Sequence, residues 1–164
     1  MGKETFDEPW VLGDTYYTAI GQYGFLSTPL QMAVATAAVA NGGDVLVPKL
    51  QFDAARELKS QVNVSDADMQ IVRDAMRQTV LRGTTQSLNV SFIEVAAKSG
   101  TAERGVSRAL VNSWAIGFWP YKDPKYAFVV MAEQGPRNYS YSVSRVMSRL
   151  LTWMNENEKQ EYFR

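Results

Sequence analysis

The segment after residue 27 is the first in which the pattern of apolar and polar residues predicts a helix. Thr28 is a favoured N-cap and Pro29 a favoured first helical residue. The Ala-rich run that follows ends at Asn41-Gly42-Gly43, a strong signal for a helix C-terminus. Its small apolar residues occupy several faces, so we expect a buried helix. Residues 1–27, rich in Gly, Tyr and Thr, are interpreted as irregular.

A second helix is predicted over residues 65–83. Ser65, with Asp68 three residues later, resembles a capping box in which Asp replaces Glu. Apolar residues then recur at helical spacing and predict one buried stripe, which Gly83 ends. The stripe consists of Met69, Val72, Met76 and Val80. Between the two helices, residues 45–50 predict a short strand, weakened by Pro48.

The apolar period then changes from helical to extended. Residues 90–97 form a mostly apolar extended segment, and residues 111–119 alternate between two faces, one of which carries Trp114, Ile116 and Phe118. Residues 126–132 are continuously apolar, which predicts a central strand covered on both faces. The prolines and the aspartate of residues 120–124 indicate the turn between the last two strands.

The C-terminal segment is strongly amphipathic. Apolar residues at i, i+3, i+4, i+7, i+8 and i+11 predict a helix that packs one face on the protein. They are Val143, Val146, Met147, Leu150, Leu151 and Met154. Short connections make the three predicted strands an antiparallel meander. We therefore expect an α+β fold in which helices cover a sheet of three consecutive strands.

Composition narrows the possible chemistry. The chain has 164 residues, 46% of them hydrophobic, which excludes a disordered chain. Its 17 basic and 17 acidic residues cancel, which argues against nucleic acid as a partner. It has neither cysteine nor histidine, so disulfides, thiolate nucleophiles, the usual zinc sites and Ser-His-Asp triads are excluded. We expect a soluble chain, because the longest apolar run is too short to span a bilayer and no signal peptide is visible. We expect no cofactor and no metal.

The motif Lys98-Ser99-Gly100-Thr101 follows the first predicted strand and combines several useful groups. Lys98 is a cation, and the hydroxyls of Ser99 and Thr101 can hold a carboxylate. Gly100 in a strand often indicates that a ligand or another backbone approaches closely. Backbone N–H groups on an open strand edge can bind an oxyanion or accept an extended peptide. The set suits a peptide that ends in a carboxylate, although an ordinary strand end with a solvated lysine fits these four residues too.

A phosphate-binding loop is the rival interpretation of Lys and Ser beside Gly, and the residue order excludes it. Such a loop needs Gly-Lys-Ser/Thr at the start of a helix, with a second glycine upstream. Here Glu94-Val95-Ala96-Ala97 precede Lys98.

Four segments, in order, resemble the penicillin-binding protein transpeptidases. Gly21-Gln22-Tyr23-Gly24 is similar to the glycine turn of that family, and Thr28-Pro29-Leu30-Gln31 is similar to its next helix start. Lys98-Ser99-Gly100-Thr101 matches the family's Lys-Thr/Ser-Gly-Thr strand, and residues 112–120 look like the strand after it. The lead-in Leu12-Gly13-Asp14-Thr15 most resembles class B enzymes of the cell-elongation type, the penicillin-binding protein 2 group.

The family's nucleophile has no match in this sequence. It is the Ser of a Ser-x-x-Lys motif, and no serine here has a lysine three positions later. Ser87-Leu88-Asn89 has the form of the family's Ser-x-Asn motif, but that motif precedes the Thr-Pro-Leu-Gln helix, so we interpret residues 87–89 as a turn. Residues 1–164 are therefore expected to be the C-terminal portion of a transpeptidase domain, a partial penicillin-binding/β-lactamase-like fold without the nucleophile-bearing portion.

The resemblance implies a role for each residue of the motif. Lys98 would supply positive potential and hydrogen-bond toward the serine of the Ser-x-Asn motif. Ser99 and Thr101 would hold the terminal carboxylate of a peptide or of a β-lactam. Gly100 would leave space for the ligand backbone, and the Thr101 N–H would be one of two oxyanion donors.

Other conspicuous residues are given structural interpretations. Glu103 and Arg104 are expected to be a solvated charge pair beside the motif. Tyr139-Ser140-Tyr141 is interpreted as a loop. Three tryptophans are expected in the core or an interface: Trp114, Trp119 and Trp153.

The function implied by the resemblance is that of a serine D,D-transpeptidase. Its parent would cross-link peptidoglycan stem peptides through an acyl-serine, be acylated by β-lactam antibiotics, and be anchored at the periplasmic face of the inner membrane. This chain alone is expected to be inactive. The alternative is a non-catalytic binding module that associates with itself or with the missing portion through exposed apolar surface. An unrelated α+β domain is the third interpretation.

Overall fold

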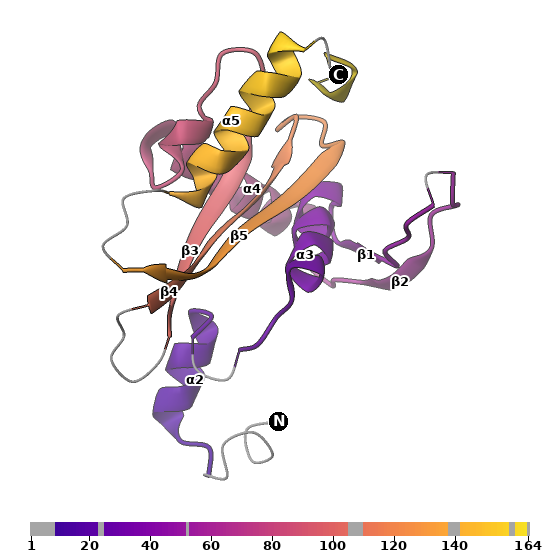
Figure 1. Cartoon of the computed structure of the whole chain (residues 1–164). Coiled ribbons are helices and arrows are strands. Elements are labelled where there is room, and N and C mark those ends of the chain that lie inside the picture. The colour runs from indigo at the N-terminus through magenta and orange to yellow at the C-terminus, as the bar shows by residue number, and fades with distance from the viewer. Residues whose placement is uncertain are drawn as a thin grey trace.

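The core of the protein is a three-stranded antiparallel sheet in the order β3-β4-β5 (Figure 1). The computed structural model describes residues 9–22, 25–51, 53–104, 110–137, 142–157 and 160–163. The strands are β3 (Ala96–Arg104), β4 (Leu110–Trp119) and β5 (Tyr126–Pro136). The expected α+β fold with a meander of three consecutive strands is confirmed.

Helices cover both faces of this sheet. The helix α5 (Val143–Glu156) contributes Met147 and Leu151 to the larger buried cluster, whereas α3 (Pro29–Asn41) contributes to a second cluster. Two consecutive residues of β3 separate these clusters: the fully buried Ala97 belongs to the first and the fully buried Ala96 to the second. The helix α4 (Asp66–Arg82) packs against β3 and supplies a side chain to each cluster, Val80 to the first and Met76 to the second.

The first two predicted helices begin and end where their capping residues place them. The Thr28 hydroxyl accepts the Gln31 N–H at 3.2 Å, and the Gln31 side chain accepts the Thr28 N–H at 2.8 Å. The helix α3 then ends at Gly42, whose φ of 91° is the left-handed conformation that favours glycine. The Ser65 hydroxyl accepts the Asp68 N–H at 3.1 Å and caps α4.

The buried faces of the helices are narrower than the sequence predicts. In α4, Val72 is 45% exposed although the other members of its predicted stripe are buried. In α5, Val146 and Leu150 are about half exposed, whereas Val143, Met147 and Leu151 are buried. The sheet covers only one face of each helix, so apolar residues at the margin of the predicted stripe stay at the surface. In α3, Thr36, Ala38 and Ala40 are buried, and Leu30 is exposed.

The prediction that residues 1–27 are irregular is wrong in part, because α2 (Leu12–Ala19) is a helix. The N-cap position is Val11, whose side chain cannot accept a hydrogen bond, so the usual N-cap signal is absent from the sequence. The capping side chain is Asp14, inside the helix, whose carboxylate accepts the Val11 N–H at 2.8 Å. None of its residues is buried. In Figure 1, α2 lies at the lower end of the sheet, away from the other helices. No helix in the described ranges is long and apolar enough to cross a membrane.

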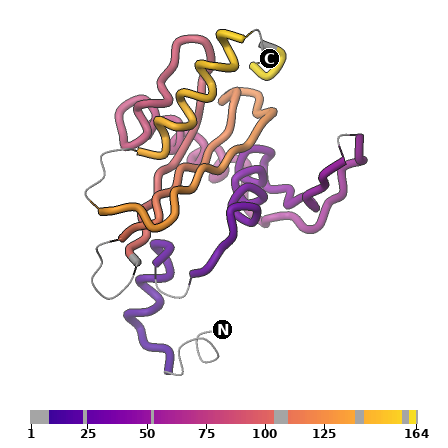
Figure 2. The backbone as a smooth tube through the Cα atoms, viewed as in Figure 1, coloured from indigo at the N-terminus to yellow at the C-terminus, as the bar shows by residue number. Residues whose placement is uncertain are grey.

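A small hairpin projects from the body of the protein. The strand β1 (Asp44–Leu46) is shorter than predicted, and it pairs with β2 (Leu58–Gln61), which the sequence did not reveal. All four residues of β2 are exposed, so no apolar alternation indicates this strand. Figure 2 shows the hairpin extending away from the three-stranded sheet.

Two details of the sheet also differ from the predictions. The first strand begins at Ala96 instead of residue 90, because Phe92 and Ile93 pack against the larger cluster without strand pairing. The motif at residues 98–101 therefore lies inside β3 and not at its end. Residues 126–132 were predicted to be a central strand, but among the described strands β4 is central and β5 lies at one side. The apolar run of β5 is explained by the helices that cover it and not by a central position.

The loop predicted at residues 139–141 lies outside the described residues.

The three tryptophans lie in different environments. Trp119 is buried, and its indole N–H donates to the backbone oxygen of Tyr162 at 2.8 Å. Trp114 is partly buried in β4. Trp153 is 53% exposed on α5, so it is not in the core, and its other expected place, an interface, stays a prediction.

The turn between β4 and β5 is held by polar side chains of α4. The hydroxyl of Tyr121 donates to Asp74, and Arg73 donates to the Tyr121 backbone oxygen at 3.2 Å. The Arg73 guanidinium also lies over the Phe118 ring, 5.8 Å from its centre. The hydrogen bond from Tyr121 lowers the pKa of Asp74 below its ordinary value, and the same bond raises the pKa of Tyr121.

Replacing Tyr121 by phenylalanine is expected to lower the melting temperature slightly, and most near neutral pH. A carboxylate whose pKa is lowered by folding stabilises the fold above its unfolded-state pKa, and this contribution is lost as the pH falls through the folded-state pKa. A phenol whose pKa is raised contributes below its unfolded-state pKa, and this is lost as the pH rises through its folded-state pKa. The difference in melting temperature between wild type and Tyr121→Phe should be largest from about pH 5 to about pH 9.

Thermal unfolding followed by circular dichroism measures the difference in melting temperature, at acid and alkaline pH outside this range as well as within it. Tyr126→Phe is the matched control, because the Tyr126 ring packs against Trp119 while its hydroxyl makes no hydrogen bond in the described part of the chain. A difference that stays constant from acid to alkali would show that the hydroxyl acts only through packing.

Candidate functional site

The motif Lys98-Ser99-Gly100-Thr101 lies in the middle of β3, where alternate residues face opposite sides of the sheet. Lys98 pairs with Ile116 of β4, and Gly100 pairs with Trp114. Because side chains alternate along a strand, Lys98 shares the face of Ala96, which α3 covers, and Ser99 shares the face of Ala97, which α5 covers. Beyond these buried alanines the sheet face opens, so the Lys98 side chain is exposed and Ser99 is partly exposed.

The outer edge of β3 is identified by the partners of its carbonyl groups. In an antiparallel pair, the backbone groups of every second residue point away from the neighbouring strand. Val95 O accepts from Arg77 at 2.9 Å, Ala97 O accepts from the Thr79 hydroxyl, and Thr101 O accepts from the Gln22 amide at 3.1 Å. These carbonyl groups therefore point away from β4, and no described strand pairs with β3 on this side.

The same geometry places two N–H groups of the motif on this outer edge. The N–H and C=O of one strand residue point to the same side, so the N–H groups of Ser99 and Thr101 point away from β4. The Lys98 ammonium also lies at this edge, because it donates to the Ser99 backbone oxygen at 2.6 Å. The edge thus offers backbone donors beside a positive charge, an arrangement suited to an extended peptide or an oxyanion.

The side chain of Ser99 is part of a pair of hydroxyls. Its Oγ lies 2.5 Å from Oγ1 of Thr84, which follows α4 in the chain. Gly100 is not required by packing, because a Cβ built there would meet only Trp114 Cβ, at an ordinary contact of 3.5 Å. The space beside Gly100 is consistent with its expected use by a ligand backbone.

The acidic residue beside the motif has a basic partner on the other side of the sheet. Glu103 forms an ion pair with Arg137, just after β5, with 3.0 Å between Nη1 and Oε1. The side chain of Arg104 is outside the described residues. Glu103 therefore has one partner across the sheet, and its expected pairing with Arg104 stays a prediction. Within the described ranges, no three acidic side chains gather as they would around a metal ion.

The fold and this edge can now be compared with known proteins. A model of the penicillin binding protein transpeptidase domain matches residues 2–152. The chain belongs to this family. The resemblance to the penicillin-binding protein 2 group, which the lead-in Leu12-Gly13-Asp14-Thr15 indicated, is confirmed by MrdA and penicillin-binding protein 2 relatives.

Three relatives show the extent of the similarity. The peptidoglycan D,D-transpeptidase MrdA of Acinetobacter baumannii is 32% identical over an alignment of 149 residues, and the match covers 77% of this chain and 22% of that protein. The structure of penicillin-binding protein PBP2 from Helicobacter pylori is 30% identical with a TM-score of 0.75, covering 94% of this chain and 29% of that one. Penicillin-binding protein A of Mycobacterium tuberculosis, in its imipenem acyl-enzyme complex, is 26% identical with a TM-score of 0.66, covering 82% and 33%.

The chain spans about a fifth to a third of the length of these penicillin-binding proteins. The transpeptidase activity of these relatives is that of the whole proteins. The structure brings together the four predicted residues on one strand, while their roles remain predictions.

Two residues at this edge were not identified as site residues from the sequence. Gln22 was part of a family-like segment without an assigned role, and its amide binds Thr101 from 79 residues away. Thr84 lies in a loop whose sequence carries no recognised motif. Ser87, in contrast, donates to Ser144 of α5 at 2.8 Å, which supports its interpretation as part of a structural turn.

Proposed function

We propose that this chain is the substrate-holding portion of a peptidoglycan D,D-transpeptidase domain, and that the outer edge of β3 binds a stem peptide or a β-lactam. The observation that supports it most directly is the edge itself. The outer edge of β3, which no described strand pairs with, carries the N–H groups of Ser99 and Thr101, the Lys98 ammonium and a hydroxyl pair. The family of the chain includes D,D-transpeptidases and a protein acylated by imipenem.

The substrate peptide would bind to the outer edge of β3 as an additional strand of the sheet. An extended peptide adds to an exposed strand through backbone hydrogen bonds. Its terminal carboxylate would accept from the hydroxyls of Ser99 and Thr101 in the positive potential of Lys98. The Thr101 N–H would donate to the carbonyl oxygen as negative charge develops there, which is the role of an oxyanion hole.

The covalent step needs a serine that this sequence does not provide. In the proposed parent reaction, the serine oxygen attacks the carbonyl of the penultimate residue, and the C–N bond to the terminal D-alanine breaks. The D-alanine leaves as an amine after it gains a proton, and an amine of a second stem peptide then displaces the serine. Since no Ser-x-x-Lys motif occurs in residues 1–164, we propose that this chain binds without being acylated.

The cellular setting follows from the same proposal. The parent would be anchored in the inner membrane with this domain at the periplasmic face, where peptidoglycan is assembled. Its partners would be the stem peptide, β-lactam antibiotics and the nucleophile-bearing portion of the domain.

Titration of the ¹⁵N-labelled chain with diacetyl-L-Lys-D-Ala-D-Ala tests the binding proposal. We expect amide shifts at Ser99 and Thr101, because their N–H groups lie on the binding edge. The purified chain treated with fluorescent penicillin should show no covalent label after denaturing electrophoresis. Stoichiometric labelling would contradict the absence of a nucleophile, and a titration that leaves the β3 amides unmoved would contradict the binding role.

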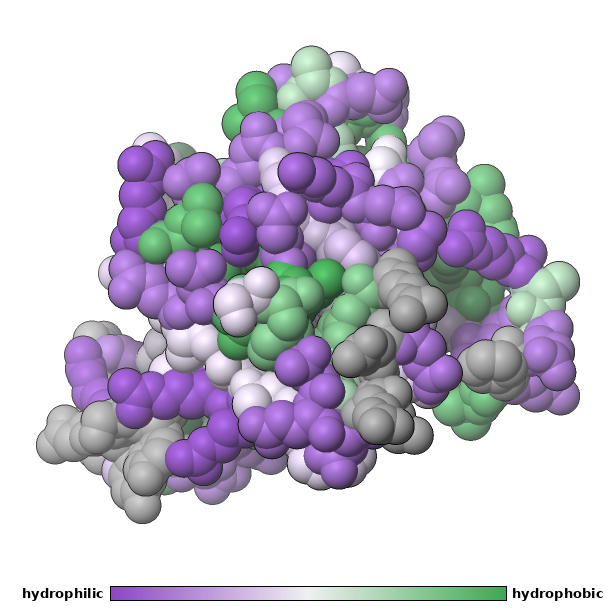
Figure 3. Space-filling model, turned by 90° about the horizontal axis from the view of Figure 1, so that it is seen from above, coloured by the Kyte–Doolittle hydropathy of each residue, from purple (hydrophilic) through white to green (hydrophobic). Residues whose placement is uncertain are grey.

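The exposed apolar surface favours one alternative, a self-associating module without substrate binding. Leu12, Ile20 and Leu26, in and after α2, are each more than two-thirds exposed. Figure 3 shows further hydrophobic patches among hydrophilic ones on the face seen from above. Patches of this kind promote association. In this alternative the peptide titration leaves β3 unchanged, so the same experiment separates the two functions.

A further inference from the structure

The contact between Thr84 and Ser99 raises the question of which hydroxyl donates. Each hydroxyl has one proton, and either atom can be the donor over the 2.5 Å between them. If Ser99 gave its proton to Thr84, it would have none for a ligand carboxylate. If Thr84 donates instead, the Ser99 proton is available to the ligand.

The loop that carries Thr84 is held firmly from both sides. The N–H groups of Gly83 and Thr85 both donate to the Thr79 backbone oxygen, at 3.0 and 3.2 Å. Thr85 is fully buried, and its hydroxyl lies 3.0 Å from the hydroxyl of Thr79. A Cβ built at Gly83 would lie 2.7 Å from Thr79 Cα, so this close approach requires glycine. The position of Thr84 is therefore fixed by its neighbours before any ligand binds.

Thr79 connects this loop to the motif strand. The Thr79 hydroxyl donates to Ala97 O, two residues before Ser99 on the same strand. The Thr79 backbone oxygen accepts the N–H groups of the loop after α4. Helix, loop and strand thus meet at one residue. Thr84 and Ser99 are placed opposite each other by this connection, and both lie beside the outer edge of β3.

We infer that Thr84 is a positioning residue for the terminal carboxylate of the ligand. This inference rests on the function proposed above. The Thr84 hydroxyl donates to Ser99 Oγ and leaves the Ser99 proton directed at the carboxylate. A hydroxyl that accepts a hydrogen bond also donates a stronger one, because the bonds in a chain polarise one another. Thr84 thereby favours ligands that end in a carboxylate over ligands that end in a neutral amide.

The test compares two ligands on three forms of the protein. Diacetyl-L-Lys-D-Ala-D-Ala and its C-terminal amide are titrated against wild type, Thr84→Val and Thr84→Ser. Valine keeps the shape of threonine without the hydroxyl, and serine keeps the hydroxyl. We expect Thr84→Val to lose about three- to tenfold in affinity for the acid and clearly less for the amide, as fits the weakening of one hydrogen bond to a charged acceptor. Thr84→Ser should restore the preference.

Each other outcome contradicts a distinct statement. If Thr84→Val prefers the acid as strongly as wild type does, or if it weakens both ligands equally, Thr84 is not a positioning residue while the proposed function stands. If wild type itself does not prefer the acid, the proposed carboxylate site and the inference both fail. Thr84→Ala, measured in parallel with a melting curve, provides the same comparison if valine disturbs the loop.

Discussion

Replacing Gly117 by alanine is expected to cost about 3 kcal/mol or more of folding free energy, because overpacking of a buried site has no room to relax here. Gly117 is buried in the central strand β4. A Cβ built on it would lie 2.4 Å from Ala96 O and 2.6 Å from Cε1 of Phe128. The first atom belongs to the backbone of β3, and the second belongs to a ring fixed in the larger cluster. The glycine is needed so that this ring can lie across the strand.

Urea unfolding measures the effect, and Gly135→Ala is the matched control. Gly135 is in β5, and a Cβ there would meet only Val111 O, at 3.9 Å. The control should unfold close to the wild-type midpoint. Gly117→Ala combined with Phe128→Leu should recover part of the loss, since the smaller side chain removes one of the two clashes. Equal midpoints for Gly117→Ala and Gly135→Ala would show that the strands adjust freely, contrary to this expectation.

The second large effect is expected on ligand binding. Lys98→Met should weaken the binding of diacetyl-L-Lys-D-Ala-D-Ala about tenfold, because a hydrogen bond to a charged group is stronger than one between neutral groups. The ammonium is exposed, and salt screens it, so the loss should shrink as salt is added. Methionine keeps the length and apolar character of the side chain without the charge.

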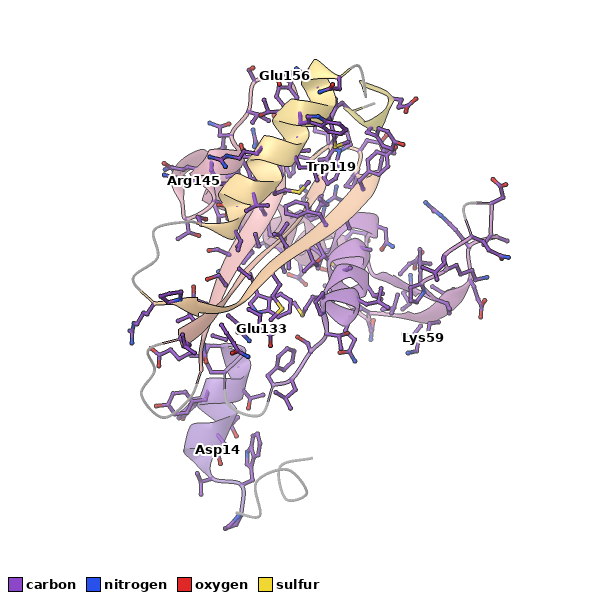
Figure 4. The ribbon with its side chains drawn as sticks, viewed as in Figure 1. Asp14, Lys59, Trp119, Glu133, Arg145 and Glu156 are labelled. Atoms are coloured by element: carbon purple, nitrogen blue, oxygen red, sulfur yellow. The ribbon has the colours of Figure 1, made fainter. Side chains whose placement is uncertain are left out.

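A control with the same change of charge separates local from general electrostatics. Lys59 lies on the β1–β2 hairpin, far from β3 (Figure 4). Lys59→Met should leave the affinity unchanged. If the two variants lose equally, the net charge of the chain is responsible, and if neither loses, Lys98 has no part in binding.

Local signals predicted the elements that are set by neighbouring residues. Thr28 and Ser65 cap their helices as their side chains suggest, and the alternation of β4 gives the correct faces. The helix α2 was missed because its cap, Asp14, is inside the helix, and β2 was missed because it is exposed on both faces. In both cases the usual local signal is absent.

The motif of the site could be located from the sequence, but its surroundings could not. Residues 98–101 were identified from their chemistry and their family resemblance. The contacts of Gln22 with Thr101 and of Thr84 with Ser99 join segments that are 79 and 15 residues apart. Such contacts depend on how the chain folds back on itself. The sequence also could not show which edge of the motif strand stays unpaired.

The exposed hairpin offers a place to attach a probe. Because the chain has no cysteine, one cysteine introduced at Lys59 would be its only thiol. All residues of β2 are exposed, and the hairpin stands away from the sheet (Figure 1), so a dye there would react readily without disturbing the core. The absence of native thiols, which first served to exclude kinds of catalysis, thus makes the protein suitable for site-specific fluorescence measurements of binding and association.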